Sequence, residues 1–244
     1  MRGKRAVPFV AAGLAVSALG VAALVLASGR GGKAGGDRYW VAPDFAEYPV
    51  HSIALLPPAT YDDNADARKL VEYAVGQALK GAGFRWVSPF LVRDYLIKPG
   101  RDSLAKAIQR KLLLSPRLDS LDAPLVSRVL RARAILSVRV DRLERMLIEA
   151  GQSGRPSTSV ELSAALVDST GRLLWTAHSS ETVEGAQQEA EANVIGVKVS
   201  GLNNEGIGNT TSAPPFPEVV IKVCLRWADP FPKHAAADTS GTGR

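Results

Sequence analysis

The stretch Val160–Ala177, which reads VELSAALVDSTGRLLWTA, decides the fold predicted for this chain. Apolar residues take alternate positions on both sides of a polar turn: Val160, Leu162, Ala164 and Leu166 before it, and Leu173, Trp175 and Ala177 after it. A period of two is typical of a strand with one buried face, and residues 168–171 (Asp-Ser-Thr-Gly) have the composition of a tight turn. The stretch therefore predicts an antiparallel hairpin.

Another strand precedes this hairpin, beginning at Ala134. Apolar residues alternate with polar ones up to Val140, and beyond it the alternation resumes one position out of step, at Leu143 and Leu147. One extra residue in a strand produces such a shift. We therefore expect a bulge or bend near Asp141.

The domain begins with a β-α-β pattern. Residues 52–56 form an apolar run closed by two prolines, which is typical of a buried strand. Apolar residues recur at helical spacing over 67–79, glycines end that helix, and residues 84–87 indicate a second strand. Because strands joined through a helix are usually parallel neighbours, we expect these two strands to lie in parallel.

Three further helices are expected between the second strand and Ala134, within residues 88–95, 102–112 and 122–130. Together these elements predict an α/β (or α+β) domain over residues 50–184, with a mixed sheet of about five strands. Both β-α-β order and an antiparallel hairpin contribute to that sheet.

Simpler segments flank this domain. Residues 30–49 are expected to form a tether and an extended lead-in, and residues 185–217 a long loop. Residues 218–230 have apolar positions at helical spacing and predict a C-terminal helix, although their β-branched residues also fit a strand. Residues 231–244 are expected to be a disordered tail.

The N-terminus carries a membrane-targeting segment. Arg2, Lys4 and Arg5 precede a charge-free apolar stretch over residues 6–29. Its length fits both a retained membrane helix and a signal peptide cleaved near Ala27, and we expect residues 1–29 to be one or the other. The protein is accordingly predicted in the cell envelope, anchored in the inner membrane and facing the periplasm, or periplasmic after cleavage.

The charge distribution argues against a nucleic-acid partner. The formal net charge is +6, but residues 1–36 contain five basic residues and no acidic one. The remainder has 25 basic and 24 acidic side chains, a net charge of +1. A nearly neutral body lacks the positive surface that phosphate binding requires. Residues 93–145 hold a local excess, thirteen basic residues against six acids, for which a solvated surface and an anionic partner both remain open.

The sequence predicts no catalytic, cofactor-binding or metal-binding residue, and the protein is expected not to be an enzyme. The single cysteine, Cys224, lies in an apolar run and indicates a small buried residue rather than a nucleophile. Acidic residues near position 65 are explained by the start of a helix rather than by a cation site. The residues considered and set aside are Asp62, Asp63, Asp66, His51, His178 and His234.

An envelope enzyme is the alternative that the histidines leave open. His178 and Glu181 with the loop that follows would form its site. Because the two residues are three positions apart on a predicted strand, their side chains should point to opposite faces, which disfavours a shared site.

Residues 50–184 resemble a group of bacterial envelope lipoproteins that includes CsgG-like and LpoB-like proteins, whose fold is similar to the N-terminal domain of TolB. The resemblance rests on four stretches in order: 53–58 (IALLPP), 79–84 (LKGAGF), 132–136 (ARAIL) and 160–175. Residues 26–29 (LASG) separately resemble a lipoprotein box, but Gly29 stands in place of the lipidated cysteine, so the sequence departs from the group's pattern at the residue that would anchor it in the outer membrane. The resemblance implies accessory proteins of envelope assembly, without catalytic residues.

The sequence therefore favours a non-enzymatic, periplasm-facing accessory protein that binds another envelope protein, as a scaffold or regulator. Its expected partners are that protein, the membrane through residues 6–29 and further copies of the chain, and no nucleic acid. A lipid-contacting or transport-auxiliary module is the alternative, and an envelope hydrolase follows it.

Overall fold

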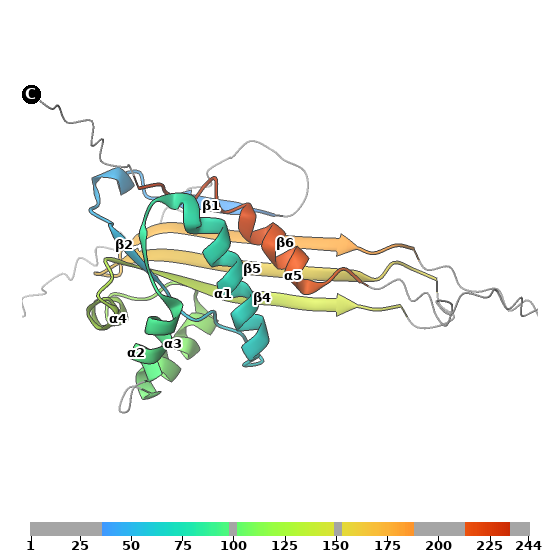
Figure 1. The fold of residues 1–244 in the computed structure, drawn as a ribbon, viewed down its shortest axis with the longest axis horizontal. Coiled ribbons are helices and arrows are strands. Elements are labelled where there is room, and N and C mark those ends of the chain that lie inside the picture. The colour runs from blue at the N-terminus through green and yellow to red at the C-terminus, as the bar shows by residue number, and fades with distance from the viewer. Residues whose placement is uncertain (1–35, 98–101, 149–152, 188–212, 235–244) are drawn as a thin grey trace, which may run out of the picture. The chain divides into compact units, whose positions relative to one another are not determined.

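The computed structural model describes residues 36–97, 102–148, 153–187 and 213–234, and in this part of the chain one six-stranded mixed sheet carries helices on both faces (Figure 1). The strands are β1 (Arg38–Val41), β2 (Ser52–Leu55), β3 (Arg85–Val87), β4 (Ala134–Met146), β5 (Ser157–Asp168) and β6 (Leu173–Glu184). The α-helices are α1 (Ala65–Leu79), α2 (Pro89–Ile97), α3 (Asp102–Leu114), α4 (Asp122–Leu130) and α5 (Phe216–Leu225). Two short 3-10 helices, η1 (Phe45–Glu47) and η2 (Lys80–Ala82), complete the described elements.

The strand order is β1-β6-β5-β4-β2-β3. β2 pairs in parallel with both β3 and β4, whereas the other pairs are antiparallel. The predicted α/β class, the β-α-β start and the hairpin are confirmed. The sheet has six strands rather than about five, because the expected extended lead-in over 30–49 contributes the edge strand β1, which pairs with β6.

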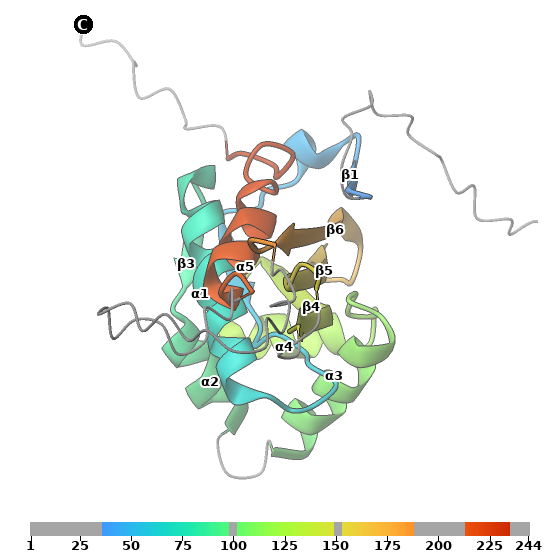
Figure 2. The same ribbon diagram turned by 90° about the vertical axis from the view of Figure 1, so that its right-hand side faces the viewer.

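The two faces of the sheet are covered by different helices. α1 and α5 lie on one face, over a core that includes Trp175, Trp227 and Phe231. α2, α3 and α4 lie on the other face, over a second core around Ile135 and Val167 (Figure 2). Figure 1 shows the long strands β4, β5 and β6 running past α2, α3 and α4, so part of this second face is not covered by any of the described helices.

The hairpin and the bulge occur where the sequence predicts them. Gly171 takes a left-handed φ of 88° in the turn, and the Asp168 carboxylate accepts hydrogen bonds from the backbone N–H groups of Thr170 and Arg172. The pairing of β4 with β5 shifts register between Val140 and Arg142, which confirms the predicted bulge.

The C-terminal region differs in one part from the expectation. The apolar run is a helix, α5, as favoured over a strand. Residues 231–234, expected to begin a disordered tail, are packed instead: Phe231 is buried, and the backbone N–H of His234 donates to the Ala82 carbonyl at 2.8 Å. The apolar side of α5 continues through Trp227 to Phe231, so burial extends past the helix.

The predicted membrane segment over residues 6–29 and most of the predicted loop over 185–217, namely residues 188–212, lie outside the described residues. The end of that predicted loop is helical, because α5 begins at Phe216. None of the helices within the described ranges combines the length and apolarity needed to cross a bilayer.

Candidate functional site

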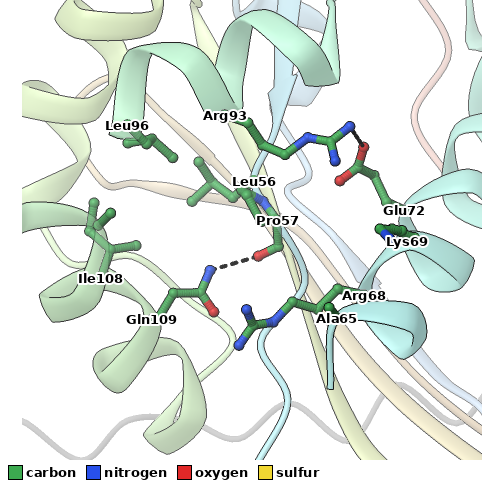
Figure 3. Close-up of a pocket in the computed structure, with 11 residues that line it drawn as sticks. Leu56, Pro57, Ala65, Arg68, Lys69, Glu72, Arg93, Leu96, Ile108 and Gln109 are labelled. Carbon is green, nitrogen blue, oxygen red and sulfur yellow. Dashed lines mark hydrogen bonds and ion pairs between the residues drawn. The ribbon is translucent and has the colours of Figure 1, made fainter. Parts of the chain in front are cut away.

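The candidate site is a pocket where the chain changes from one face of the sheet to the other. After β2 the chain enters α1 on one face, and after the neighbouring strand β3 it enters α2 on the opposite face. A crevice at the carboxyl ends of parallel strands with this arrangement is where open α/β sheets bind ligands. A cavity of about 270 Å³ lies at this point, bordered by α1, α2, α3 and the end of β2 (Figure 3).

The floor of this pocket is apolar. Leu56 follows β2 directly, Leu96 comes from α2 and Ile108 from α3, and all three belong to the second core. Each helix turns an apolar side toward the sheet, and the pocket is the gap that their side chains leave between the helices. The Gln109 side chain closes one wall by donating from Nε2 to the Pro57 carbonyl at 2.9 Å.

The rim of the pocket is basic. Arg68 and Lys69 both lie near Glu72 on α1, because residues three and four positions apart are neighbours on a helix surface. Arg93 of α2 faces them, and its Nη2 lies 3.3 Å from Glu72 Oε1. Figure 3 shows Arg68 reaching from α1 toward Gln109. The rim thus carries three cations and one carboxylate.

Two groups on α1 are electrostatically unusual. Burial raises the pKa of Glu72, and the adjacent Arg93 lowers it by less, so the net shift is upward. The Nε of Arg68 is buried and has no hydrogen-bond partner in the described part of the chain, although its Nη2 pairs with Asp63. A buried donor without a partner is costly. An acceptor on a bound group would therefore gain a hydrogen bond here.

Cys224 and Glu181 both lie on the α5 side of the sheet, where burial accounts for the first and ion pairs account for the second. Cys224 is fully buried, and burial raises the pKa of its thiol to about 12. Glu181 receives hydrogen bonds from Lys222 at 2.5 Å and from Arg226 at 2.7 Å, which connects β6 to α5.

The three histidines are not as scattered as the sequence suggests. His51 Nδ1 lies 3.2 Å from His234 Nε2, although the residues are 183 positions apart. His178 lies instead beside Asp141 and Glu161, on the face of the sheet opposite α5. His178 and Glu181 therefore do not meet, as the spacing predicts.

The acidic residues near the start of α1 act as predicted for a helix N-terminus. Asn64 caps the helix, and its side chain accepts from the backbone N–H groups of Asp66 and Ala67. Asp62 accepts from the N–H of Asn64, and Asp63 pairs with Arg68. Each carboxylate thus has a role in the turn or in the first turns of the helix.

The basic excess over residues 93–145 is paired in part: among the described residues, four of its cations, Arg93, Lys111, Arg139 and Arg142, lie in ion pairs with acids. Lys111 lies 2.5 Å from Asp122, and Arg139 pairs with Asp141. A separate hollow of about 360 Å³ holds Arg85, Arg131 and Arg133, for which no ion pair occurs among the described residues. The sequence indicated the basic excess over residues 93–145 but not the pocket rim. Two of the three rim cations, Arg68 and Lys69, lie outside that range.

Comparisons with known proteins leave the family open. No protein-family model and no curated protein matches the sequence. Among solved structures, the PelC dodecamer from Paraburkholderia phytofirmans is 15% identical, covering 82% of this chain and 99% of that chain, with a TM-score of 0.45. The lipoprotein GNA1162 from Neisseria meningitidis is 18% identical, covering 55% of this chain and 83% of that chain, with a TM-score of 0.42. Likenesses of this size do not assign the chain to a family.

Proposed function

We propose that this chain is a non-enzymatic binding protein of the bacterial cell envelope, facing the periplasm, and that its pocket holds a segment of another envelope protein. The observation that carries the proposal is the apolar pocket with a rim of Arg68, Lys69 and Arg93 at the carboxyl end of β2. The matching segment presents an apolar side chain next to an acidic one.

The size of the pocket supports a side chain of a partner protein rather than a whole small-molecule substrate. At about 270 Å³ it is smaller than the range of about 300–1,000 Å³ that is typical of ligand pockets. Protein interfaces commonly place one large apolar side chain in a well-packed pocket and surround it with polar contacts. An apolar floor below a charged rim has that arrangement.

The charges on the rim support an acidic partner. Arg93 is already paired with Glu72, whereas Arg68 retains a buried, unpaired Nε. Lys69 is exposed, and its Nζ lies 3.4 Å from Asp66 Oδ1, in a solvent-screened pair that a partner's carboxylate can replace. A carboxylate at the mouth would accept hydrogen bonds from one or both of these side chains, and a charge-assisted bond is stronger than a neutral one.

The residues that line the pocket support a binding role. They include no serine, cysteine or histidine, and their one carboxylate, Glu72, is paired with Arg93. The enzyme alternative based on His178 and Glu181 loses its support because those side chains lie on opposite faces of the sheet. The envelope location rests on the basic residues at the N-terminus followed by the apolar stretch 6–29.

The test is capture of partners from envelope membranes with matched variants. Ala105 borders the pocket, and Ala105→Trp fills the cavity without removing a floor residue; Lys69→Glu reverses one rim charge. The control is Lys106→Glu, which makes the same charge reversal at an exposed residue of α3 that does not line the pocket. We expect specific envelope proteins to bind the wild type and Lys106→Glu and to be lost from both pocket variants. Recovery of the same proteins with Ala105→Trp would contradict the proposal.

Contact with anionic lipid is a second candidate, favoured by the hollow that holds Arg85, Arg131 and Arg133 beside His51. Co-sedimentation of the chain from Asp37 onward with vesicles that contain acidic lipid tests it. Binding that salt reduces, and that Arg131→Glu weakens more than Arg110→Glu, supports lipid contact. Equal binding to neutral vesicles eliminates it.

A further inference from the structure

Three side chains able to ligate a metal meet on the part of the second sheet face that none of the described helices covers. They are Asp141 on β4, Glu161 on β5 and His178 on β6. His178 Nε2 lies 3.4 Å from Glu161 Oε1, and His178 Nδ1 lies 3.8 Å from Asp141 Oδ2. One ligand atom from each residue lies within 4.8 Å of the other two.

The bulge in β4 accounts for the position of Asp141. In the ladder, Val140 pairs with Leu162 and Arg142 with the next residue of β5, Glu161, which leaves Asp141 as the extra residue. A bulge of this kind places two consecutive side chains of one strand opposite a single residue of the other. Asp141 is thereby brought to the same face as Glu161.

Neighbouring groups hold the three side chains in place. Ser163 donates from Oγ to Asp141 Oδ2, and the same Oγ lies 3.1 Å from His178 Nδ1. Arg139 pairs with the other oxygen of Asp141, Oδ1. Hydrogen bonds from surrounding groups that orient the ligands are a regular part of metal sites.

The cluster has the exposure of an accessible but ordered site. The Asp141 side chain is 14% exposed, that of Glu161 29% and that of His178 33%. A cation can reach these side chains from solvent, and the surrounding strands restrict their motion.

The donor set determines which ions fit. Imidazole nitrogen with carboxylate oxygens suits zinc and its neighbours among the divalent transition metals, whereas calcium and magnesium favour oxygen donors throughout. We propose that Asp141, Glu161 and His178 form a binding site for a divalent transition-metal ion, with three protein ligands and at least one position open to water or to an external donor.

The neighbouring cations set a limit on affinity. Arg139 pairs with Asp141, and Arg142 Nε lies 3.9 Å from Glu161 Oε2, so the ion competes with two guanidinium groups. The second oxygen of each carboxylate makes no ion pair with these arginines, although that of Asp141 accepts the Ser163 hydrogen bond. The side chains also need to move together for ligand atoms to reach about 2.0–2.2 Å from zinc. We therefore expect binding in the micromolar range rather than the very tight binding of a closed structural site.

This site is separate from the α1–α2–α3 pocket, and the two proposals are tested independently. The test is isothermal titration of the full chain in detergent micelles with zinc chloride, with His178→Gln, Asp141→Asn and Glu161→Gln as variants. We expect about one zinc ion per chain and an affinity at least tenfold weaker in each variant. X-ray absorption of the bound zinc should show nitrogen and oxygen ligands and no sulfur.

The matched control is His51→Gln, because His51 and His234 form a second pair of imidazoles, 3.2 Å apart. This variant should bind zinc like the wild type. Loss of binding in His51→Gln with retention in His178→Gln would overturn the proposal. So would the absence of binding at a zinc concentration of about 0.1 mM, roughly 100 times a micromolar dissociation constant, because a site of that affinity is filled there. Thermal melting of each variant without zinc distinguishes loss of a ligand from loss of the fold.

Discussion

His178 and Glu181, three residues apart on β6, point to opposite faces of the sheet and bind different partners. His178 lies 3.4 Å from Glu161, whereas Glu181 accepts hydrogen bonds from Lys222 and Arg226 of the C-terminal segment. The alternation of a strand thus places one residue in a cluster of potential ligands and the other in the attachment of α5 to the sheet.

Glu181→Gln should destabilise the fold in a pH-dependent way. Burial alone raises the pKa of Glu181, but Lys222 and Arg226 together outweigh burial, and the net pKa is lowered. A lowered folded-state pKa contributes stability above the unfolded-state pKa, and this contribution is lost as the pH falls through the folded-state pKa. We expect a loss of about 1–2 kcal/mol at pH 7 that shrinks toward pH 3.

Urea unfolding across that pH range measures the difference. Glu184→Gln is the control, because the Glu184 side chain is 57% exposed and its pair with Arg155 is screened by water. A Glu181→Gln penalty that is the same at pH 3 and at pH 7 would contradict this account.

The thiol of Cys224 should be inert in the folded protein. Burial raises its pKa to about 12, so the thiolate is scarce at pH 8, and the side chain is inaccessible to reagents. Iodoacetamide at pH 8 should label the chain in urea and leave it unlabelled in buffer, as mass spectrometry can determine. Rapid labelling of the folded chain would show that α5 leaves the sheet readily.

Gly171→Ala should be strongly destabilising, whereas Gly76→Ala should stabilise. Gly171 has a left-handed φ of 88°, and a Cβ there would lie 2.7 Å from the Ser120 Cα. Gly76 lies within α1, and a Cβ would meet no atom within 4 Å. We expect a cost of about 1–3 kcal/mol for the first substitution and a gain of about 0.5–1 kcal/mol for the second.

Thermal melting compares the two glycine variants directly. Replacing glycine by alanine has the same effect on the unfolded chain at both positions. Stability changes of opposite sign would therefore come from the backbone conformation and the contacts of the folded state. Similar melting temperatures for both variants would mean that the turn at Gly171 adjusts without strain.

Glu72→Gln should become more favourable relative to the wild type as the pH rises. The pKa of Glu72 is raised, chiefly by burial, so its protonated form is favoured in the folded state. A raised folded-state pKa contributes stability below the unfolded-state pKa, which is lost as the pH rises through the folded-state pKa. The glutamine amide is uncharged throughout this pH range. The stability of Glu72→Gln relative to the wild type should therefore increase between pH 4 and pH 7.

Urea unfolding at these two pH values is the measurement for Glu72. The exposed Glu47 supplies the control substitution Glu47→Gln, for which no such trend is expected. A trend in the opposite direction would mean that Arg93 dominates the environment of Glu72.

Local periodicity explains which parts of the fold were predictable. The hairpin of β5 and β6 follows from the alternation of apolar residues in each strand and from the composition of the turn between them. The bulge near Asp141 follows from a shift in the alternation of β4. Both patterns depend only on residues that are neighbours in the sequence. β1 is only four residues long, lies at the edge of the sheet and gains its identity from pairing with β6, a partner far along the chain. Nothing within residues 38–41 specifies that pairing.

The pocket and the ligand cluster were unpredictable for the same reason. Arg68 and Lys69 fit the polar side of an ordinary amphipathic helix, and only the crossing of the chain between the two faces of the sheet brings Arg93 toward them. Asp141, Glu161 and His178 lie on three strands, and sequence spacing does not specify which residues of neighbouring strands become adjacent. The bulge was a usable signal, because bulges often redirect a side chain near a site.

Asp141 is surplus to the strand ladder. If this residue were deleted, Val140 would still oppose Leu162, Arg142 would still oppose Glu161, and the inward and outward alternation would continue without a break. A single-residue deletion in the middle of a long strand normally exchanges its faces, but this one should restore a regular strand and leave the two cores intact. We therefore expect the chain to fold without the insertion, so that the deletion variant separates the contribution of the Asp141 carboxylate from that of the sheet that carries it.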